Sequence, residues 1–183
     1  MKEPELDFFS LYISIQTPLS MTARIETIQE KKLVGMRMLM CHGKYRMGEL
    51  WGRFMPRRKE IAGQLTNDLI SLAVYAPGHF TRFNPDREFE RWATVEVSDF
   101  DEVPNQMETI RWPGGLYAVF HYAGSAAGIS GFYQEIYGVW LPGSGYVLDE
   151  RPHAEVMGEK YSNNDPASEE TIWIPIKPKT KFD

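Results

Sequence analysis

The sequence predicts an α+β fold made of two similar modules, each with the element order β-α-β-β. A four-residue motif occurs twice, as Ile25–Ile28 (IETI) and as Met107–Ile110 (METI). After each copy the hydrophobic patterns predict the same order of elements, a strand, a helix and two further strands. Because the repeated motif and the repeated order agree, we interpret the chain as an internal duplication. We expect antiparallel sheets with helices on one face and a cleft between the modules.

The first module is predicted to span residues 22–98 and the second residues 106–177, joined by a linker at Val97–Gln106 that contains Pro and Asp. In the first module we expect a strand at Leu33–Cys41, a helix at about 45–62 and strands at Leu69–Tyr75 and Trp92–Ser98. In the second we expect a strand at Leu116–Tyr122, a helix at about 126–141 and strands at His153–Met157 and Thr171–Ile176.

Apolar spacing assigns faces to these elements. The second helix carries apolar residues at three- and four-residue intervals, which is typical of a helix lying on a sheet. In the last strand three isoleucines alternate with other residues, so we place them under the helix and Trp173 on the opposite face. By the same alternation Trp92 and Glu96 lie on the uncovered face of the first module. These uncovered faces predict a ligand groove, or alternatively an interface between the modules that binds nothing.

Composition limits the possible functions. The net charge is -5 and no long run of Lys and Arg is present, so direct nucleic-acid binding is not expected. A single cysteine, Cys41, excludes an internal disulfide and favours a reducing compartment such as the cytoplasm. The four histidines lack metal-ligand spacing, and we expect neither a metal nor another cofactor. The 13% aromatic content is high and suits the walls of an apolar pocket.

Residues 1–20 are predicted to be an appendage to the fold, either disordered or upstream of a true start at Met21. The alternative is an additional edge strand at Phe8–Ile15. This stretch contains two serines and follows acidic residues, so it resembles neither a signal peptide nor a membrane span.

Residues 114–177 resemble the GyrI-like effector-binding family, which also supplies the ligand domain of some AraC-type and MerR-type regulators. The matching pieces follow the family's order. They are Gly115–Phe120, Trp140–Pro142 with Ser144–Tyr146, Arg151–Glu155, and Asn164–Pro166 leading to Ile172–Ile176. The first half is similar more loosely, through Lys32–Arg37 and Trp51. The resemblance implies a tandem pair of β-α-β-β modules with pseudo-two-fold symmetry. It also implies a cleft between them that binds hydrophobic, often cationic, organic molecules.

The resemblance also implies where the ligand is held. The family's pocket carboxylate falls on Glu155, and an aromatic cleft with a carboxylate would suit a cation. Many relatives carry Glu where this chain has Thr171, and we expect Glu169 to substitute if the strand extends that far. The candidate aromatic walls are Trp51, Trp92, Tyr117, Trp140 and Trp173.

Three functions follow as hypotheses. The first is a stand-alone protein that binds a small organic molecule, with a protein partner that could read the ligand state. The second is a hydrolase that detoxifies reactive electrophiles such as cyclopropane-bearing genotoxins, as the resemblance implies for some members, with Glu155 or Glu96 as general base. The third is a protein that shields a target such as gyrase, which only the family name supports.

Overall fold

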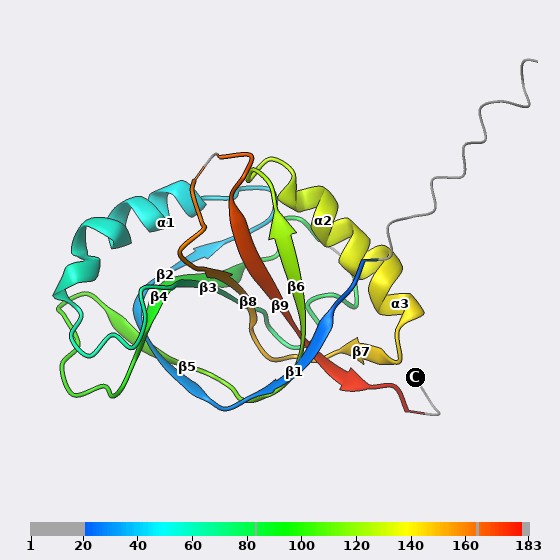
Figure 1. Cartoon of the computed structure of the whole chain (residues 1–183), viewed down its shortest axis with the longest axis horizontal. Helices are drawn as coiled ribbons and strands as arrows, with labels where there is room; N and C mark the ends of the chain where they lie inside the picture. Colours follow the sequence, from blue (N-terminus) through cyan, green and yellow to red (C-terminus); the bar gives the residue numbers. More distant parts are fainter. Residues whose placement is uncertain (1–20, 83, 164, 181–183) are drawn as a thin grey trace, which may run out of the picture.

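The computed structural model describes residues 21–82, 84–163 and 165–180, and the predicted appendage at 1–20 lies outside this part. The described residues form one antiparallel sheet with two main helices (Figure 1). This confirms the predicted α+β class. The strands are β1 (Arg24–Ile28), β2 (Lys31–Met40), β3 (Leu69–Val74), β4 (Phe89–Val97), β5 (Glu108–Trp112), β6 (Gly115–Ala123), β7 (Tyr146–Leu148), β8 (His153–Met157) and β9 (Glu169–Pro178).

The order of strands across the sheet is symmetric about its centre. It runs β1-β6-β9-β8-β3-β4-β2-β5, and β7 pairs with β9. At the centre β3 pairs with β8, with Leu69 opposite Met157 and Ala73 opposite His153. The two predicted sheets are therefore one continuous sheet, because β3 of the first half is hydrogen-bonded to its counterpart β8 in the second half.

The two copies of the repeated motif lie at the outer ends of this sheet, and each pairs across the pseudo-two-fold axis. Strand β1 is followed after two residues by β2, yet it pairs with β6. Strand β5 is followed after two residues by β6, yet it pairs with β2. At the crossing, a side chain on Gly114 would meet the backbone carbonyl of Ile28 at 2.8 Å. The close approach explains why glycine occupies this position.

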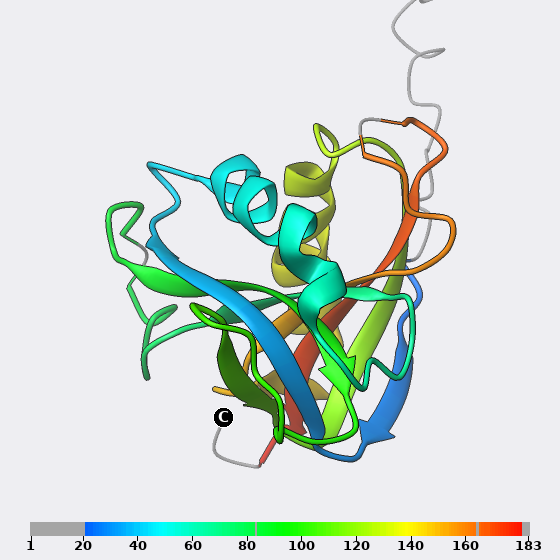
Figure 2. The same ribbon diagram turned by 90° about the vertical axis from the view of Figure 1, so that its left-hand side faces the viewer.

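Both helices lie on one face of the sheet (Figure 2). Helix α1 (Met47–Phe54) continues into a 3-10 segment (Met55–Glu60), and α2 (Ile129–Glu135) continues through a π-helical turn (Ile136–Trp140) into α3 (Leu141–Gly143). No helix in the described ranges is long and apolar enough to cross a membrane.

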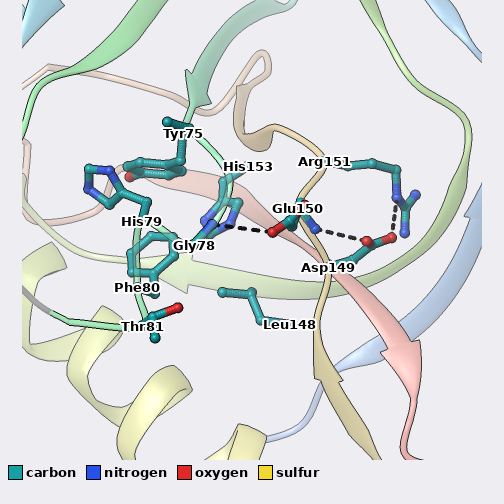
Figure 3. Close-up of a pocket in the computed structure, with 11 residues that line it drawn as sticks. Tyr75, Gly78, His79, Phe80, Thr81, Leu148, Asp149, Glu150, Arg151 and His153 are labelled. Carbon is teal, nitrogen blue, oxygen red and sulfur yellow. Dashed lines mark hydrogen bonds and ion pairs between the residues drawn. The ribbon is translucent and has the colours of Figure 1, made fainter.

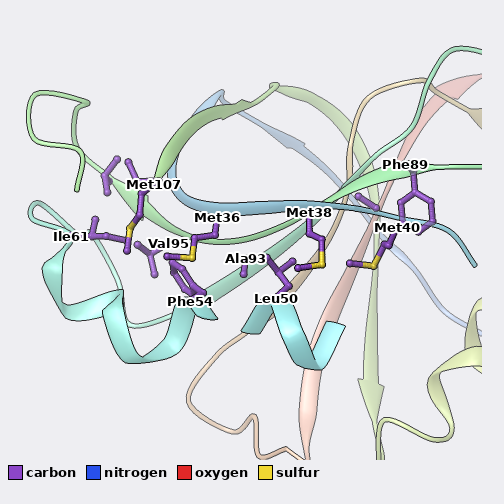
Figure 4. Close-up of a cluster of buried hydrophobic side chains, with 13 residues drawn as sticks. Met36, Met38, Met40, Leu50, Phe54, Ile61, Phe89, Ala93, Val95 and Met107 are labelled. Atoms are coloured by element: carbon purple, nitrogen blue, oxygen red, sulfur yellow. The ribbon is translucent and has the colours of Figure 1, made fainter. Parts of the chain in front are cut away.

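Each helix seals its own hydrophobic cluster against the sheet. Under α1, Leu50 and Phe54 are fully buried among residues of β2 and β4, with a row of methionines from β2 (Figure 4). Under α2, the isoleucines of β9 pack with Phe120 and Ile136. The predicted placement of these isoleucines beneath the helix is confirmed.

A third cluster fills the opposite face of the sheet. Trp112 of β5, from one end of the strand order, contacts Tyr117 of β6 and Trp173 of β9, near the other end, with ring centroids 5.8 and 5.5 Å apart. The indole N–H of Trp112 donates to the hydroxyl of Tyr117 over 3.0 Å. These contacts show that the sheet curls around this cluster. The face that carries no helix is therefore covered by the protein's own aromatic side chains.

Candidate functional site

A cavity of about 490 Å³ lies on the face of the sheet that carries the helices. Residues of both halves enclose it. Its floor is formed by strand residues, and its walls by α1 on one side and the segments after β6 and β8 on the other. The lining residues used below are Tyr45, Trp51, Arg91, Glu155, Tyr161 and Glu170.

A buried ion pair lies in the floor of this cavity. The guanidinium of Arg91 is 2.7 Å from one carboxylate oxygen of Glu155, and the hydroxyl of Tyr133 donates to the other oxygen over 2.7 Å. The side chains of Arg91 and Glu155 are 4% and 12% exposed. Burial disfavours a charged guanidinium, but the facing carboxylate of Glu155 and the surrounding tyrosines together outweigh burial and raise the pKa of Arg91 above its ordinary value. The buried guanidinium therefore stays charged, with the carboxylate of Glu155 as its counter-charge.

The register of the central strands explains how this pair forms. Glu155 on β8 lies opposite Ser71 on β3, and Arg91 on β4 lies opposite Ala73 on β3. Strand β3 thus lies between the two charged residues, and the strands that carry them, β4 and β8, are about 10 Å apart. Because the β3 residues between them are small, the long arginine side chain can reach across β3 to the carboxylate.

Glu170 on β9 is the other carboxylate of the cavity. Burial, and after it the negative charge of Glu155, raise its pKa to about 7, while Arg91 acts in the opposite direction. Among the residues the structure describes, no side-chain hydrogen bond or ion pair engages this carboxylate. At neutral pH it is therefore close to half ionised and open to a ligand.

Helix α2 and the π-helical turn that follows it contribute one tyrosine each, Tyr133 and Tyr137, which stack above β8. The rings of Tyr133 and Tyr137 are 6.0 Å apart at 11°, one turn apart on the helix. Tyr133 bonds Glu155, and the hydroxyl of Tyr137 lies 2.8 Å from Nδ1 of His153, two residues earlier on the strand. Burial, followed by the nearby Arg91, lowers the pKa of His153 to about 3, so its imidazole is neutral.

A smaller hollow of about 170 Å³ lies beyond His153, between the loop after β3 and the segment after β7 (Figure 3). The ring of Phe80 stacks on His153 with centroids 5.5 Å apart at 12°, and Tyr75 meets the same imidazole edge-on at 5.0 Å. The buried Nδ1 of His79 has no hydrogen-bond partner among the described residues. These aromatic side chains close the helix-bearing face at this end.

The structure brings two of the sequence-predicted site residues together, since Glu155 and Trp51 both line the larger cavity. The other five are elsewhere. Trp140 packs beneath α2, with its ring 4.9 Å from that of Phe120. Trp92, Tyr117 and Trp173 belong to the cluster on the opposite face, where Glu96 pairs with Lys31 at 2.6 Å.

The cavity therefore lies on the helix-bearing face of the sheet, whereas the sequence predicted a groove on the face without helices. The alternation of faces was interpreted correctly for Trp92 and Trp173, but the curled sheet fills that face with their own rings. The open space lies instead between the helices, where α1 and α2 do not meet over the central strands β3 and β8.

Sequence reasoning missed Arg91, Glu170 and Tyr45, although two of them carry a readable signal. Arg91 shares its face with the buried Ala93 and Val95, and a charge on an otherwise apolar strand face requires a partner. Glu170 shares the face of the isoleucines of β9 by the same alternation.

The residue expected to replace the family glutamate lies outside the cavity. Glu169, one residue away from Glu170, is bound to His121 at 3.0 Å and to Lys160 at 3.1 Å instead. It is also absent from the cavity lining. Because successive strand residues face opposite ways, the position next to Glu169 supplies the cavity carboxylate.

Two halves of equal topology that enclose a cavity of this size define a small-molecule-binding α+β domain. Residues 21–177 match the model of the GyrI-like small molecule binding domain. The chain belongs to this family, and the predicted resemblance is confirmed.

Known relatives agree with this assignment. The chain is 33% identical over 165 residues to the transcriptional regulator BrlR of Pseudomonas aeruginosa. The matched region covers 86% of this chain but only 56% of the regulator. The structure of SAV2435 bound to tetraphenylphosphonium is similar with a TM-score of 0.63 at 14% identity, covering 86% of this chain and 94% of that one. The EcmrR C-terminal domain has a TM-score of 0.63 at 12% identity, covering 88% and 100%. At these identities the two structures show a shared fold.

Proposed function

We propose that this domain binds a hydrophobic organic cation in the cavity between α1 and the segments after β6 and β8. The observation that carries the proposal is the make-up of the cavity. About 490 Å³ is enclosed by aromatic and apolar side chains, with two carboxylates, Glu155 and Glu170, against the single guanidinium of Arg91. With both carboxylates ionised, the cavity has one uncompensated negative charge.

The volume and the walls suit a lipophilic molecule. Ligand pockets commonly measure about 300–1,000 Å³ and are lined mainly by apolar and aromatic groups. The rings of Trp51 and Tyr45 line the cavity. A ring face attracts a cation by about 0.5–2 kcal/mol. A desolvated cation needs a counter-charge, and a carboxylate in the wall supplies it.

The relatives support the same reading. SAV2435 was solved with tetraphenylphosphonium, which is a bulky cation with apolar rings. BrlR is a transcriptional regulator, so a domain of this family in a longer protein accompanies gene control. For the present chain we propose that ligand binding is the primary event and that a partner protein responds to it.

Isothermal titration calorimetry with tetraphenylphosphonium at pH 8 tests the proposal. Tetraphenylborate, which has nearly the same shape and the opposite charge, is the matched control ligand. We expect saturable binding of the cation at a one-to-one ratio and much weaker binding of the anion. Equal affinities for the two ions, or no heat with either, would remove the basis for a cation site.

Tryptophan fluorescence locates the binding event. Trp51 lines the cavity, whereas Trp140 packs beneath α2 outside it. The variant Trp51→Phe should lose most of the fluorescence response to tetraphenylphosphonium, and Trp140→Phe should retain it. The reverse result would place the ligand away from the cavity.

A further inference from the structure

The pairing of Arg91 with Glu155 bears on which carboxylate a cation would meet. Both oxygens of Glu155 are already occupied, one by the guanidinium at 2.7 Å and the other by the hydroxyl of Tyr133 at 2.7 Å. The Arg91 side chain is only 4% exposed. A cation bound to Glu155 would leave a buried guanidinium without a counter-charge, which is strongly unfavourable. The carboxylate that matches the family position is thus used within the protein.

Glu170 differs from Glu155 in having no such partner within the described ranges. It extends from β9 into the same cavity, beside the aromatic walls. The charged and titratable groups that line the cavity with it are Glu155 from β8, Arg91 from β4, Tyr45 before α1 and Tyr161 after β8. Helix α1 adds apolar side chains and no charge to the lining. Since the Arg91 and Glu155 charges cancel, the state of Glu170 sets the net charge of the cavity.

We propose that Glu170, rather than Glu155, is the counter-charge for a cationic ligand, and that proton loss from Glu170 switches the cavity from neutral to cation-binding. This inference rests on the proposed function and identifies the residue that determines its specificity. A cavity with Glu170 protonated keeps its apolar walls and accepts uncharged molecules. A cavity with Glu170 ionised favours a cation.

The raised pKa of Glu170, about 7, gives the direction of the pH dependence. Below pH 7 the free protein holds a proton on Glu170, and a cation must displace it. The affinity for tetraphenylphosphonium should therefore fall by about tenfold for each pH unit below about 6 and level off above about pH 8. At pH 7 the binding of one cation should release about half a proton to the buffer.

Calorimetry between pH 5.5 and 8.5, repeated in buffers of different ionisation enthalpy, measures both effects. In Glu170→Gln the affinity at pH 8 should fall by roughly ten- to a hundredfold, the pH dependence should vanish and proton release should cease. The matched control is Glu169→Gln, since Glu169 is engaged by His121 and Lys160 outside the cavity. This control should behave as the unaltered protein does. Thermal melts of both variants establish that they are folded.

The outcomes separate this inference from the proposed function. If the unaltered protein binds the cation and Glu170→Gln binds it equally well at pH 8, the assignment of Glu170 is overturned while cation binding stands. Affinity that does not change between pH 5.5 and 8.5 would also overturn it. If the unaltered protein fails to bind at any pH, the cation-binding function itself is refuted.

Discussion

Removal of one partner of the buried Arg91–Glu155 pair should destabilise the domain strongly. In Arg91→Met the carboxylate of Glu155 remains in the cavity floor at 12% exposure with only the Tyr133 hydroxyl to bind it. Loss of one partner of a buried ion pair commonly costs about 3–5 kcal/mol. Because Glu155 keeps this hydrogen bond and some contact with solvent, we expect about 3 kcal/mol. For a domain of this size that corresponds to a fall in Tm of roughly 6–12 °C.

Urea denaturation at pH 7.5, followed by circular dichroism, measures the loss. The control is Arg46→Met, which breaks an ion pair with Glu49 whose side chains are 41% and 47% exposed. An exposed pair contributes about 0–1 kcal/mol, so this variant should be close to the unaltered protein. The double variant Arg91→Met with Glu155→Leu removes both charges and should recover most of the loss. A single-variant loss below about 1 kcal/mol, or a double variant no better than the single one, would refute the reasoning.

Three further outcomes follow from the structure. Tyr137→Phe removes the partner of the buried His153 ring, so the unfolding free energy in urea should fall by about 1–3 kcal/mol, and a value unchanged within error would contradict that bond. Gly35→Ala should destabilise severely, since its new methyl group would overlap the backbone of β4, whereas Gly52→Ala, in open space on α1, should gain about 0.5–1 kcal/mol. A similar urea midpoint for both would argue against this packing. Because the folded protein raises the pKa of Glu170 to about 7, its carboxylate costs stability as pH rises from about 4.5 through 7. Glu170→Gln should therefore raise Tm at pH 8 and not at pH 4, and a gain of equal size at both would exclude titration as the cause.

The local patterns of the sequence predicted six of the nine described strands, the two main helices and the faces of these elements. Among the described strands, β1 and β5 were noted only as the repeated motif and not as strands. Strand β7, three residues long, was also not predicted, because the Pro142–Gly145 turn cluster hides it. The second helix was predicted as one continuous element, whereas its π-helical turn follows from packing around the fully buried Ile136. The resemblance to a family of known fold then supplied the arrangement that local patterns alone could not.

For the site, the sequence led to Glu155 and Trp51 but not to their surroundings. The aromatic residues that it nominated were on the face that it assigned, yet the curl of the sheet turns that face into packed interior. The partner of Glu155 could not be found from spacing along the chain, because Arg91 reaches it across an intervening strand.

The sequence by itself determined the duplication, the class of fold and the alternation that places the isoleucines of β9 under a helix, because these follow from short-range periodicity. Only the tertiary structure decided that β1 and β5 pair across the two halves, that β3 and β8 join them into one sheet, and that the cavity opens between the helices. Such features depend on the register between strands distant in the chain. A shift of one residue in that register exchanges the two faces of a strand without any change in its composition.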